Sequence, residues 1–182
     1  EKITFMDLEK TIKKFKNIKI YVVGDTIVDK YNVCTVLGQT TKTPTFSIKK
    51  DSEEKFLGGA GVVASHLKKL GSQVIFTTVI GKDHAGKYVL SSLKKNKIKN
   101  NCIIDLSRNT TQKERFWADN HKLIQVDEVD NHVISEKIQL MISKIIKKTK
   151  VQGIIFSDFR HGIFNSDTIN FFLKKINKSC FK

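Results

Sequence analysis

Three short segments of the chain are apolar and β-prone without polar alternation, which is typical of strands buried on both faces. They are Ile18–Val23, Gln73–Ile80 and Gly153–Phe156. Apolar residues at helical spacing follow in segments 61–70, 83–96 and 135–148, and again after Ser166, which we expect to cap its helix. Strands that alternate with helices predict an α/β fold with a parallel sheet between helical layers.

Two further segments alternate apolar and polar residues, as strands with one exposed face do. Segment 31–56 contains two such pieces around Gly38 and Pro44, and segment 111–127 contains two more on either side of a predicted turn at Ala118–Lys122. We expect these pieces to form a smaller antiparallel sheet beside the main one. The length of 182 residues fits one domain, or a large part of one.

The chain carries a formal net charge of +15, from 33 Lys and Arg against 18 Asp and Glu. Only three of these cations are Arg, and the Lys residues are spread along the whole chain. Proteins that recognise specific nucleic-acid sequences depend on Arg side chains. We therefore interpret the lysines as a solvated surface and do not expect nucleic-acid binding. Attraction to anionic substrates remains an open alternative.

Compartment and metal binding can be judged from the same composition. No apolar run reaches the roughly 18–20 residues that cross a bilayer, and the first residues lack the apolar core of a signal peptide. Cys34, Cys102 and Cys180 are widely separated, and the histidines show no metal-ligand spacing. We therefore expect a reduced, cytoplasmic protein with no membrane segment and no metal site.

Acidic residues follow two of the predicted core strands, where open α/β sheets bind their ligands. Asp25 and Asp29 come after the first strand and Asp158 after the third. A carboxylate in this place can accept hydrogen bonds from two sugar hydroxyls. The alternative is that Asp25 caps a turn and Asp29 is only solvated.

A glycine cluster and a pair of cations are the other candidate binding groups. Gly58, Gly59 and Gly61 would let a ligand approach the backbone, or would serve close helix packing. Gly59–Ala64 also fits a dinucleotide-binding pattern with Asp83 downstream, but no apolar strand precedes it. Strand alternation places Lys113 and Arg115 on one face, where they could hold a phosphate or merely protect an exposed edge strand.

Taken in chain order over roughly residues 18–175, these segments resemble the PfkB/ribokinase family of carbohydrate kinases. The resemblance is strongest to its heptose-phosphate kinase branch, the kinase half of bifunctional ADP-heptose synthases. The segments that carry it are Val22–Tyr31, Phe56–Ala64, Leu70–Val74, Val79–Asp83, Thr111–Arg115, Leu123–Asp127 and Phe156–Phe159.

The resemblance implies a doubly wound α/β domain with a β-sheet lid, often paired with the lid of a second subunit in a homodimer. It implies phosphoryl transfer from Mg·ATP to a hydroxyl of a sugar or sugar phosphate. By resemblance, Asp29, Gly58 and Gly59 hold sugar hydroxyls. Lys113 and Arg115 lie near the existing phosphate of the sugar or support the lid. Asp158 lines the same cleft.

The sequence departs from the family at three places. Val62 stands where many relatives have an Asn that contacts the sugar, and His161 stands where heptose-phosphate kinases commonly have Lys. The Gly-Ala-Gly-Asp motif, which supplies the catalytic base, is absent from the sequence. We therefore assign no catalytic residue within the chain and expect the base and the ATP-binding half to lie beyond Lys182.

Residues 1–182 are accordingly predicted to be an N-terminal portion of a sugar kinase, with the acceptor-binding side and lid strands within 31–56 and 111–127. Alone, this portion is expected to show no turnover. Two alternatives remain open at this point. One is a non-catalytic sugar-binding or dimerisation module derived from the fold, and the other is a dinucleotide-binding domain.

Overall fold

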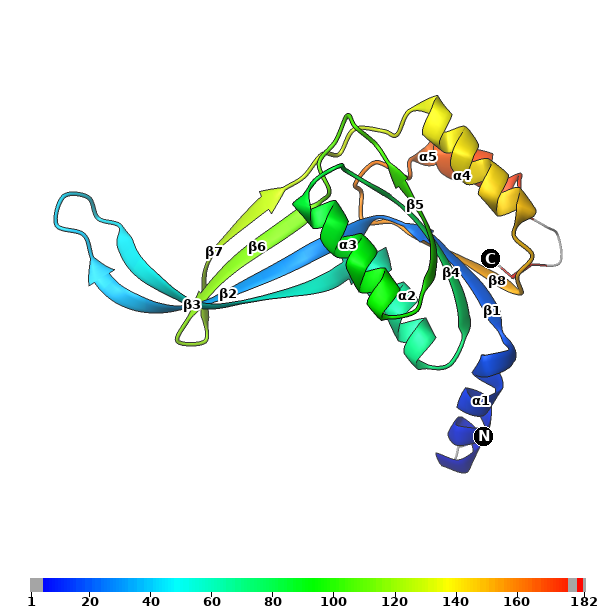
Figure 1. The fold of residues 1–182 in the computed structure, drawn as a ribbon, viewed down its shortest axis with the longest axis horizontal. Coiled ribbons are helices and arrows are strands. Elements are labelled where there is room, and N and C mark those ends of the chain that lie inside the picture. Colours follow the sequence, from blue (N-terminus) through cyan, green and yellow to red (C-terminus); the bar gives the residue numbers. More distant parts are fainter. Residues whose placement is uncertain (1–4, 177–179, 182) are drawn as a thin grey trace.

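The computed structural model describes residues 5–176, 180 and 181, and its main body is built on a parallel sheet (Figure 1). The strand order is β5-β4-β1-β8, and each neighbouring pair is parallel. The sheet comprises β1 (Lys19–Gly24), β4 (Gln73–Ile80), β5 (Lys99–Ile104) and β8 (Gly153–Ser157). The predicted α/β class is therefore confirmed.

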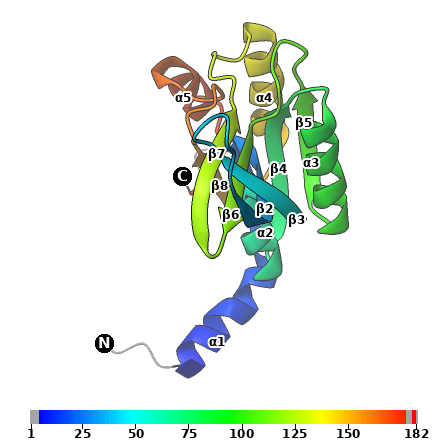
Figure 2. The same cartoon turned by 90° about the vertical axis from the view of Figure 1, so that its left-hand side faces the viewer.

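Helices cover both faces of this sheet, as a doubly wound fold requires (Figure 2). Val22 faces one side and packs with α2 (Ala60–Lys69) and α3 (His84–Lys95). Its neighbours Tyr21 and Val23 face the other side and pack with α4 (Glu136–Lys148) and α5 (Ser166–Leu173). Alternate residues of one strand thus enter two separate cores, because successive side chains of a strand point to opposite faces.

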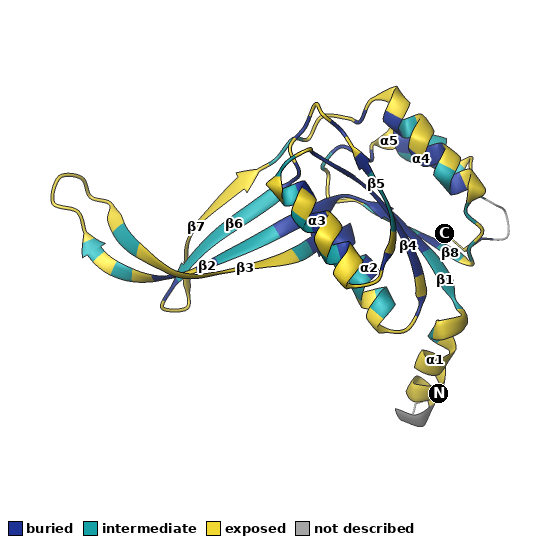
Figure 3. Cartoon of the chain, in the orientation of Figure 1, coloured by how far each residue is buried: buried dark blue, intermediate teal, exposed yellow. Residues whose placement is uncertain are grey.

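A second sheet projects from the body as a lid (Figure 1). Its strand order is β3-β2-β6-β7. These strands are β2 (Thr26–Gln39), β3 (Phe46–Gly59), β6 (Gln112–Ala118) and β7 (His121–Glu128). Figure 3 shows that much of this sheet is exposed or half-buried, in contrast to the strands of the body.

The lid departs from the predicted sheet in its pairing and in its extent. We expected antiparallel strands throughout, but β2 and β6 pair in parallel, so the sheet is mixed. After the first hairpin the chain runs through α2, β4, α3 and β5 of the body before it returns to the lid as β6. A crossover of this kind allows two strands to pair in parallel. The first hairpin also extends beyond both ends of the predicted segment 31–56, because β2 begins at Thr26 and β3 ends at Gly59. Asp29 consequently lies within β2, and Gly58 and Gly59 form the end of β3.

Smaller features were predicted with mixed success. The turn between β6 and β7 is confirmed, and its two residues Asp119 and Asn120 both have positive φ, as tight hairpins favour. The predicted cap at Ser166 is wrong, because Asn165 caps α5 and Ser166 is its first helical residue. Helix α1 (Phe5–Lys14), the short helix η1 (Phe15–Asn17) and strand β5 were not predicted.

One face of the lid is held by a charge cluster centred on Glu53 of β3. Its carboxylate pairs with Lys50, with Lys55 at 3.1 Å and with Lys30 at 3.3 Å. Lys30 also pairs with Glu114 of β6 at 2.9 Å, so the cluster joins three strands. The hydrogen bond from Lys50 and the other two cations lower the pKa of Glu53 from 4.5 to about 2.

We predict that the lid loses this stabilisation in strong acid. Because the folded-state pKa of Glu53 lies below its unfolded value, the ionised cluster stabilises the lid above the unfolded pKa and stops doing so as the pH falls toward about 2. Carboxyl ¹³C NMR should give the low midpoint in the native protein. Lys50→Gln should raise that midpoint, and Lys42→Gln in the exposed lid loop should not. A native midpoint near the free-Glu value of about 4.3 would contradict the prediction.

Candidate functional site

Asp25 follows β1 directly and is almost fully buried, with 2% of its surface exposed. Its carboxylate accepts backbone N–H bonds from Phe159 at 3.0 Å, His161 at 3.2 Å and Ile163 at 3.4 Å. Burial raises the pKa of Asp25, and the three N–H donors offset part of that rise. These bonds favour the turn-capping interpretation, in which Asp25 ties the end of β1 to the loop that follows β8.

Asp29 lies on β2 with its side chain over Gly58, at the base of the lid. The two residues are diagonal neighbours on the same face of the β2–β3 pair. A Cβ atom on Gly58 would overlap the Oδ2 atom of Asp29. The other oxygen, Oδ1, accepts a hydrogen bond from Nη1 of Arg115 at 2.5 Å. The structure therefore brings three predicted site residues, Asp29, Gly58 and Arg115, into direct proximity.

Gly59 makes the junction between the lid and helix α2. Its φ of 56° lies in the region that side chains disfavour, and a Cβ atom there would overlap the carbonyl oxygen of Asp25. That same carbonyl accepts the N–H of Ala60 at 2.8 Å, which fixes the start of the helix. Close packing thus explains Gly59, whereas Gly58 borders the Asp29 carboxylate.

Two cations of β6 lie on the Asp29 face of the lid. Lys113 pairs with Asp29 across the β2–β6 ladder, and Arg115 is two residues further along the same strand. Nζ of Lys113 is 3.8 Å from Oδ2 of Asp127 on β7. The guanidinium of Arg115 lies over the ring of Tyr31, 5.1 Å from its centroid. Each cation is thus oriented by a neighbour but keeps donors free for a further partner, since both groups have several N–H bonds.

The loop after β8 carries Asp158 and His161 toward the same region. Asp158 is exposed and accepts the N–H of Arg160 at 2.7 Å. Burial lowers the pKa of His161, and the charges of Asp25, Lys113, Asp127 and Asp158 also act on it. Charges of the lid strands β6 and β7 thus act on this loop, which its hydrogen bonds to Asp25 hold at the end of β1.

Two further candidate residues, Val62 and Asp83, lie outside the cluster around Asp29. Val62 lines a groove between α2 and α3. Asp83 caps α3 by accepting the N–H of Gly86 at 2.6 Å and also accepts the N–H of Thr110 at 2.6 Å. The dinucleotide alternative requires a parallel strand before its glycines and a free acid downstream, but Gly59 ends an antiparallel strand and Asp83 is bonded internally.

Arg108 is a positioning residue that the sequence did not indicate. Its side chain is 4% exposed and its Nε atom is 2.9 Å from Oδ2 of Asp105. The two terminal nitrogens donate to the carbonyl oxygens of His161 at 2.9 Å and His132 at 2.7 Å. Arg108 therefore joins three loops at the carboxyl edge of the sheet, among them the loop that carries Asp158.

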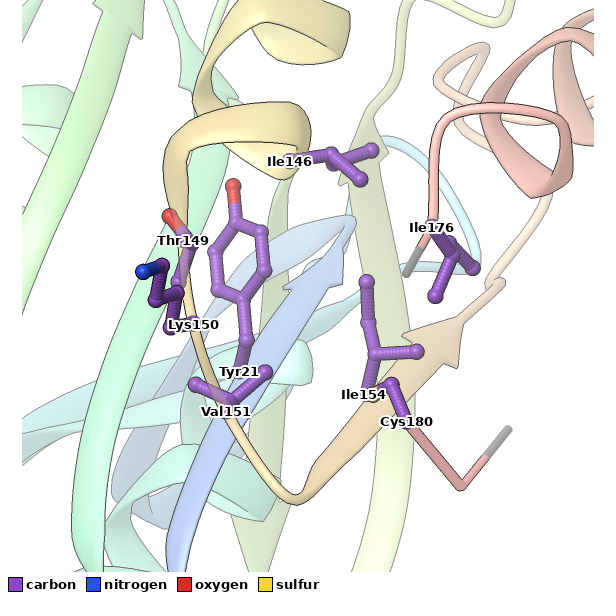
Figure 4. Close-up of a pocket in the computed structure, with 8 residues that line it drawn as sticks. All are labelled: Tyr21, Ile146, Thr149, Lys150, Val151, Ile154, Ile176 and Cys180. Carbon is purple, nitrogen blue, oxygen red and sulfur yellow. The ribbon is translucent and has the colours of Figure 1, made fainter. Parts of the chain in front are cut away.

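A small cavity of about 180 Å³ lies elsewhere, between α4 and the sheet (Figure 4). Tyr21, Ile146 and Ile154 form much of its apolar wall. Tyr21 precedes Asp25 by four residues of extended chain, so the cavity is about 13 Å from Asp25. Its lining contains no carboxylate, and we assign no chemistry to it.

Neither a metal cluster nor a membrane helix is found within the described residues. Residues 5–176, 180 and 181 contain no group of three or more His, Cys, Asp or Glu side chains placed to hold a metal ion. In the same part of the chain, no helix has the length and apolar character needed to cross a bilayer.

The doubly wound body, the lid and the cluster at its base define a carbohydrate-kinase type of domain. A family model described as "pfkB family carbohydrate kinase" matches residues 17–152. The chain therefore belongs to the pfkB family of carbohydrate kinases, and the predicted family is confirmed.

Curated relatives include the bifunctional protein HldE of Campylobacter jejuni subsp. doylei, which is 31% identical over 157 residues. That match covers 86% of this chain and 33% of the relative. HldE of Helicobacter pylori strain J99 is 32% identical over 165 residues, covering 88% of this chain and 35% of the relative. The chain thus spans about a third of the length of these relatives.

Solved structures confirm the ribokinase-like fold. Phosphofructokinase-2 from Escherichia coli in complex with fructose-6-phosphate gives a TM-score of 0.69 at 13% identity. It covers 91% of this chain, which spans 53% of that protein. A putative phosphofructokinase from Staphylococcus aureus gives a TM-score of 0.67 at 18% identity, covering 86% of this chain and 49% of that protein.

Proposed function

We propose that this chain forms the acceptor-binding side of a kinase that transfers a phosphoryl group from ATP to a hydroxyl of a sugar or sugar phosphate. The observation that carries the proposal is the cluster at the lid base, where the Asp29 carboxylate lies over Gly58 and beside Arg115. Membership of a carbohydrate-kinase family supports the same class of reaction.

Asp29 is the proposed hydroxyl-binding group. Its side chain is 22% exposed, so it is accessible and also partly shielded from water. A carboxylate offers several lone pairs, and it can accept hydrogen bonds from two neighbouring hydroxyls. The missing side chain of Gly58 leaves space for this carboxylate at the end of β3. Asp29 would therefore orient the acceptor ring, and such positioning supplies much of the rate enhancement in phosphoryl transfer.

Lys113 and Arg115 support an acceptor that already carries a phosphate. Both cations belong to the Asp29 face of the lid, and arginine in particular matches the geometry of phosphate oxygens. Asp158 is proposed to line the same cleft from the body. The HldE relatives favour a heptose phosphate within this class of acceptors. Asp25 and Arg108 would hold the loop of Asp158 in place without touching the sugar.

The nucleotide and Mg²⁺ do not fit the residues described here. The sequence contains no Gly-Ala-Gly-Asp motif, and residues 5–176, 180 and 181 hold no acidic cluster suited to a metal ion. We propose that the catalytic base, the ATP site and Mg²⁺ depend on polypeptide outside these 182 residues, in a cytoplasmic enzyme. This chain covers only about half of each solved relative, which supports this division.

The decisive experiment is an ADP-release assay on a polypeptide that continues past Lys182, with a panel of hexoses, heptoses and their phosphates as acceptors. Turnover with a sugar phosphate, and none by residues 1–182 alone, is expected. Failure to phosphorylate any acceptor would contradict the kinase proposal. Saturable acceptor binding without turnover would instead support the non-catalytic module, which the replacement of the usual Asn by Val62 favours.

The exposed apolar residues of the lid support a homodimer formed through this sheet. Val33 and Phe56 lie on the same face of the sheet and are 51% and 48% exposed. Sedimentation velocity should detect the dimer, and charged substitutions at these positions should dissociate it.

We predict that Gly58→Ala weakens acceptor binding by about tenfold or more, because the new methyl group displaces the Asp29 carboxylate and a charge-assisted hydrogen bond is lost. Isothermal titration with the best acceptor of the panel measures the change. Gly153→Ala is the matched control, since its Cβ atom would meet nothing nearer than the Phe181 carbonyl oxygen at 3.9 Å. Equal affinities for the two variants would refute the proposed placement of Asp29.

A further inference from the structure

A groove of about 520 Å³ runs between α2 and α3, beneath the β3 strand of the lid. Helix α2 contributes Ser65, His66 and Lys69, and α3 contributes Ser92 and Lys95. None of the proposed acceptor-binding groups Asp29, Lys113 or Arg115 is part of its lining. The groove is therefore a separate feature of the body.

Helical geometry explains why these polar groups line one channel. Ser65 and Lys69 are four residues apart on α2, and Ser92 and Lys95 are three apart on α3. Residues at these spacings lie on the same face of a helix. The two polar faces border the groove from opposite sides, so the ammonium groups and the Ser92 hydroxyl are available to one ligand. The Ser65 hydroxyl donates to the carbonyl oxygen of Gly61 at 2.8 Å and can only accept.

The other end of the groove is apolar and fixed in position. Phe56, Val62 and Tyr88 contribute to its lining there. The hydroxyl of Tyr88 donates to the backbone carbonyl of Lys55 at 2.5 Å, which fastens α3 to β3. The groove consequently offers an aromatic and aliphatic wall at the lid and hydrogen-bond donors farther along the helices.

The charge of the groove is positive and only partly balanced. Among the described residues, its lining includes three lysines and a histidine but no carboxylate. Lys55 pairs with Glu53, as do Lys30 and Lys50 elsewhere on the lid. Within residues 5–176, 180 and 181, by contrast, Lys69 and Lys95 have no ion pair. Two unpaired ammonium groups with neighbouring hydroxyls form a favourable environment for an anion.

We propose that this groove binds a phosphorylated small molecule. Its phosphate would accept hydrogen bonds from Lys69, Lys95 and the hydroxyl of Ser92. Its apolar or ring portion would lie against Val62 and Tyr88. The phosphate contacts do not depend on the proposed kinase function, because Lys69, Lys95 and Ser92 are not among the proposed acceptor-binding residues, and Val62 is the one residue considered for both sites.

Phenyl phosphate and inorganic pyrophosphate are suitable probes, titrated into the full chain by calorimetry at low ionic strength. The double variant Lys69→Gln/Lys95→Gln is expected to weaken the binding of both probes at least tenfold. The control is Lys68→Gln/Lys94→Gln, which removes the same charge from the same helices outside the groove lining. This control should change the affinity by less than twofold.

Phenyl phosphate should also bind more tightly than inorganic phosphate, and it should shift the backbone NMR signals of Ser65 and Ser92. Equal weakening by the two double variants would show attraction to net charge alone and overturn the proposal. Absence of saturable binding at millimolar probe would overturn it too. Circular dichroism of all variants checks that their helices are retained.

Discussion

Replacing Arg108 with alanine is expected to lower the free energy of unfolding by about 3–5 kcal/mol. The substitution removes the guanidinium that pairs with Asp105, where the two side chains are 4% and 9% exposed. It also removes the donors to the carbonyl oxygens of His132 and His161. The Oδ2 atom of Asp105 and two carbonyl oxygens would then lose their donor, while Ser107 would still donate to Oδ1. Burial of polar atoms without a partner is costly.

Urea unfolding followed by the fluorescence of Trp117, the single tryptophan, measures this effect. Arg160→Ala is the matched control, since Arg160 is exposed in the same loop region. The control is expected to change stability by less than about 0.5 kcal/mol. Arg108→Lys should recover only part of the loss, because an ammonium cannot reproduce the planar fork of the guanidinium. Comparable stability of Arg108→Ala and the control would show that the three loops are held by other contacts.

The second large effect is expected at Asp29. Asp29→Asn should weaken the binding of both sugars and sugar phosphates by about 10–100-fold, because charge-assisted hydrogen bonds to hydroxyls are lost. The substitution conserves shape, so the affinity should fall without a comparable loss of stability. Calorimetric titration with the best acceptor of the panel gives the affinity, and urea unfolding gives the stability.

Glu114→Gln is the control for Asp29→Asn. Glu114 is also a carboxylate of the lid, but it pairs with Lys30 on the other face of the sheet. Its substitution should leave acceptor affinity within about twofold, since Glu114 faces away from the proposed acceptor site. An equal loss of affinity in both variants would indicate a general effect of lid charge, contrary to a specific role for Asp29.

The sequence was most informative about the buried strands of the body. β1 and β4 are apolar on both faces because each has a neighbour on either side and a helical layer above and below. β5 escaped prediction because it is an edge strand whose first residues, Lys99, Asn100 and Asn101, are polar. The other edge strand, β8, is apolar and was predicted, so the polar start of β5 is what distinguishes it.

The lid was predicted in outline but not in its pairing. Local alternation identifies strands, whereas the parallel β2–β6 pairing is set by the body between them, which a local pattern does not describe. Asp29 and Gly58 were candidates because one follows a predicted core strand and the other belongs to a glycine cluster before a helix, and the family resemblance strengthened both. Arg108 was not, because two of its three partners are backbone carbonyls, and a sequence gives no sign of which carbonyls will need a donor.

A crystal structure of this chain with its best-binding sugar phosphate would test the account most directly. We predict adjacent sugar hydroxyls within hydrogen-bond distance of the Asp29 carboxylate, beside Gly58, with the phosphate on Lys113 or Arg115. A sugar bound anywhere that leaves Asp29 without a hydroxyl partner would contradict the acceptor site proposed for this domain.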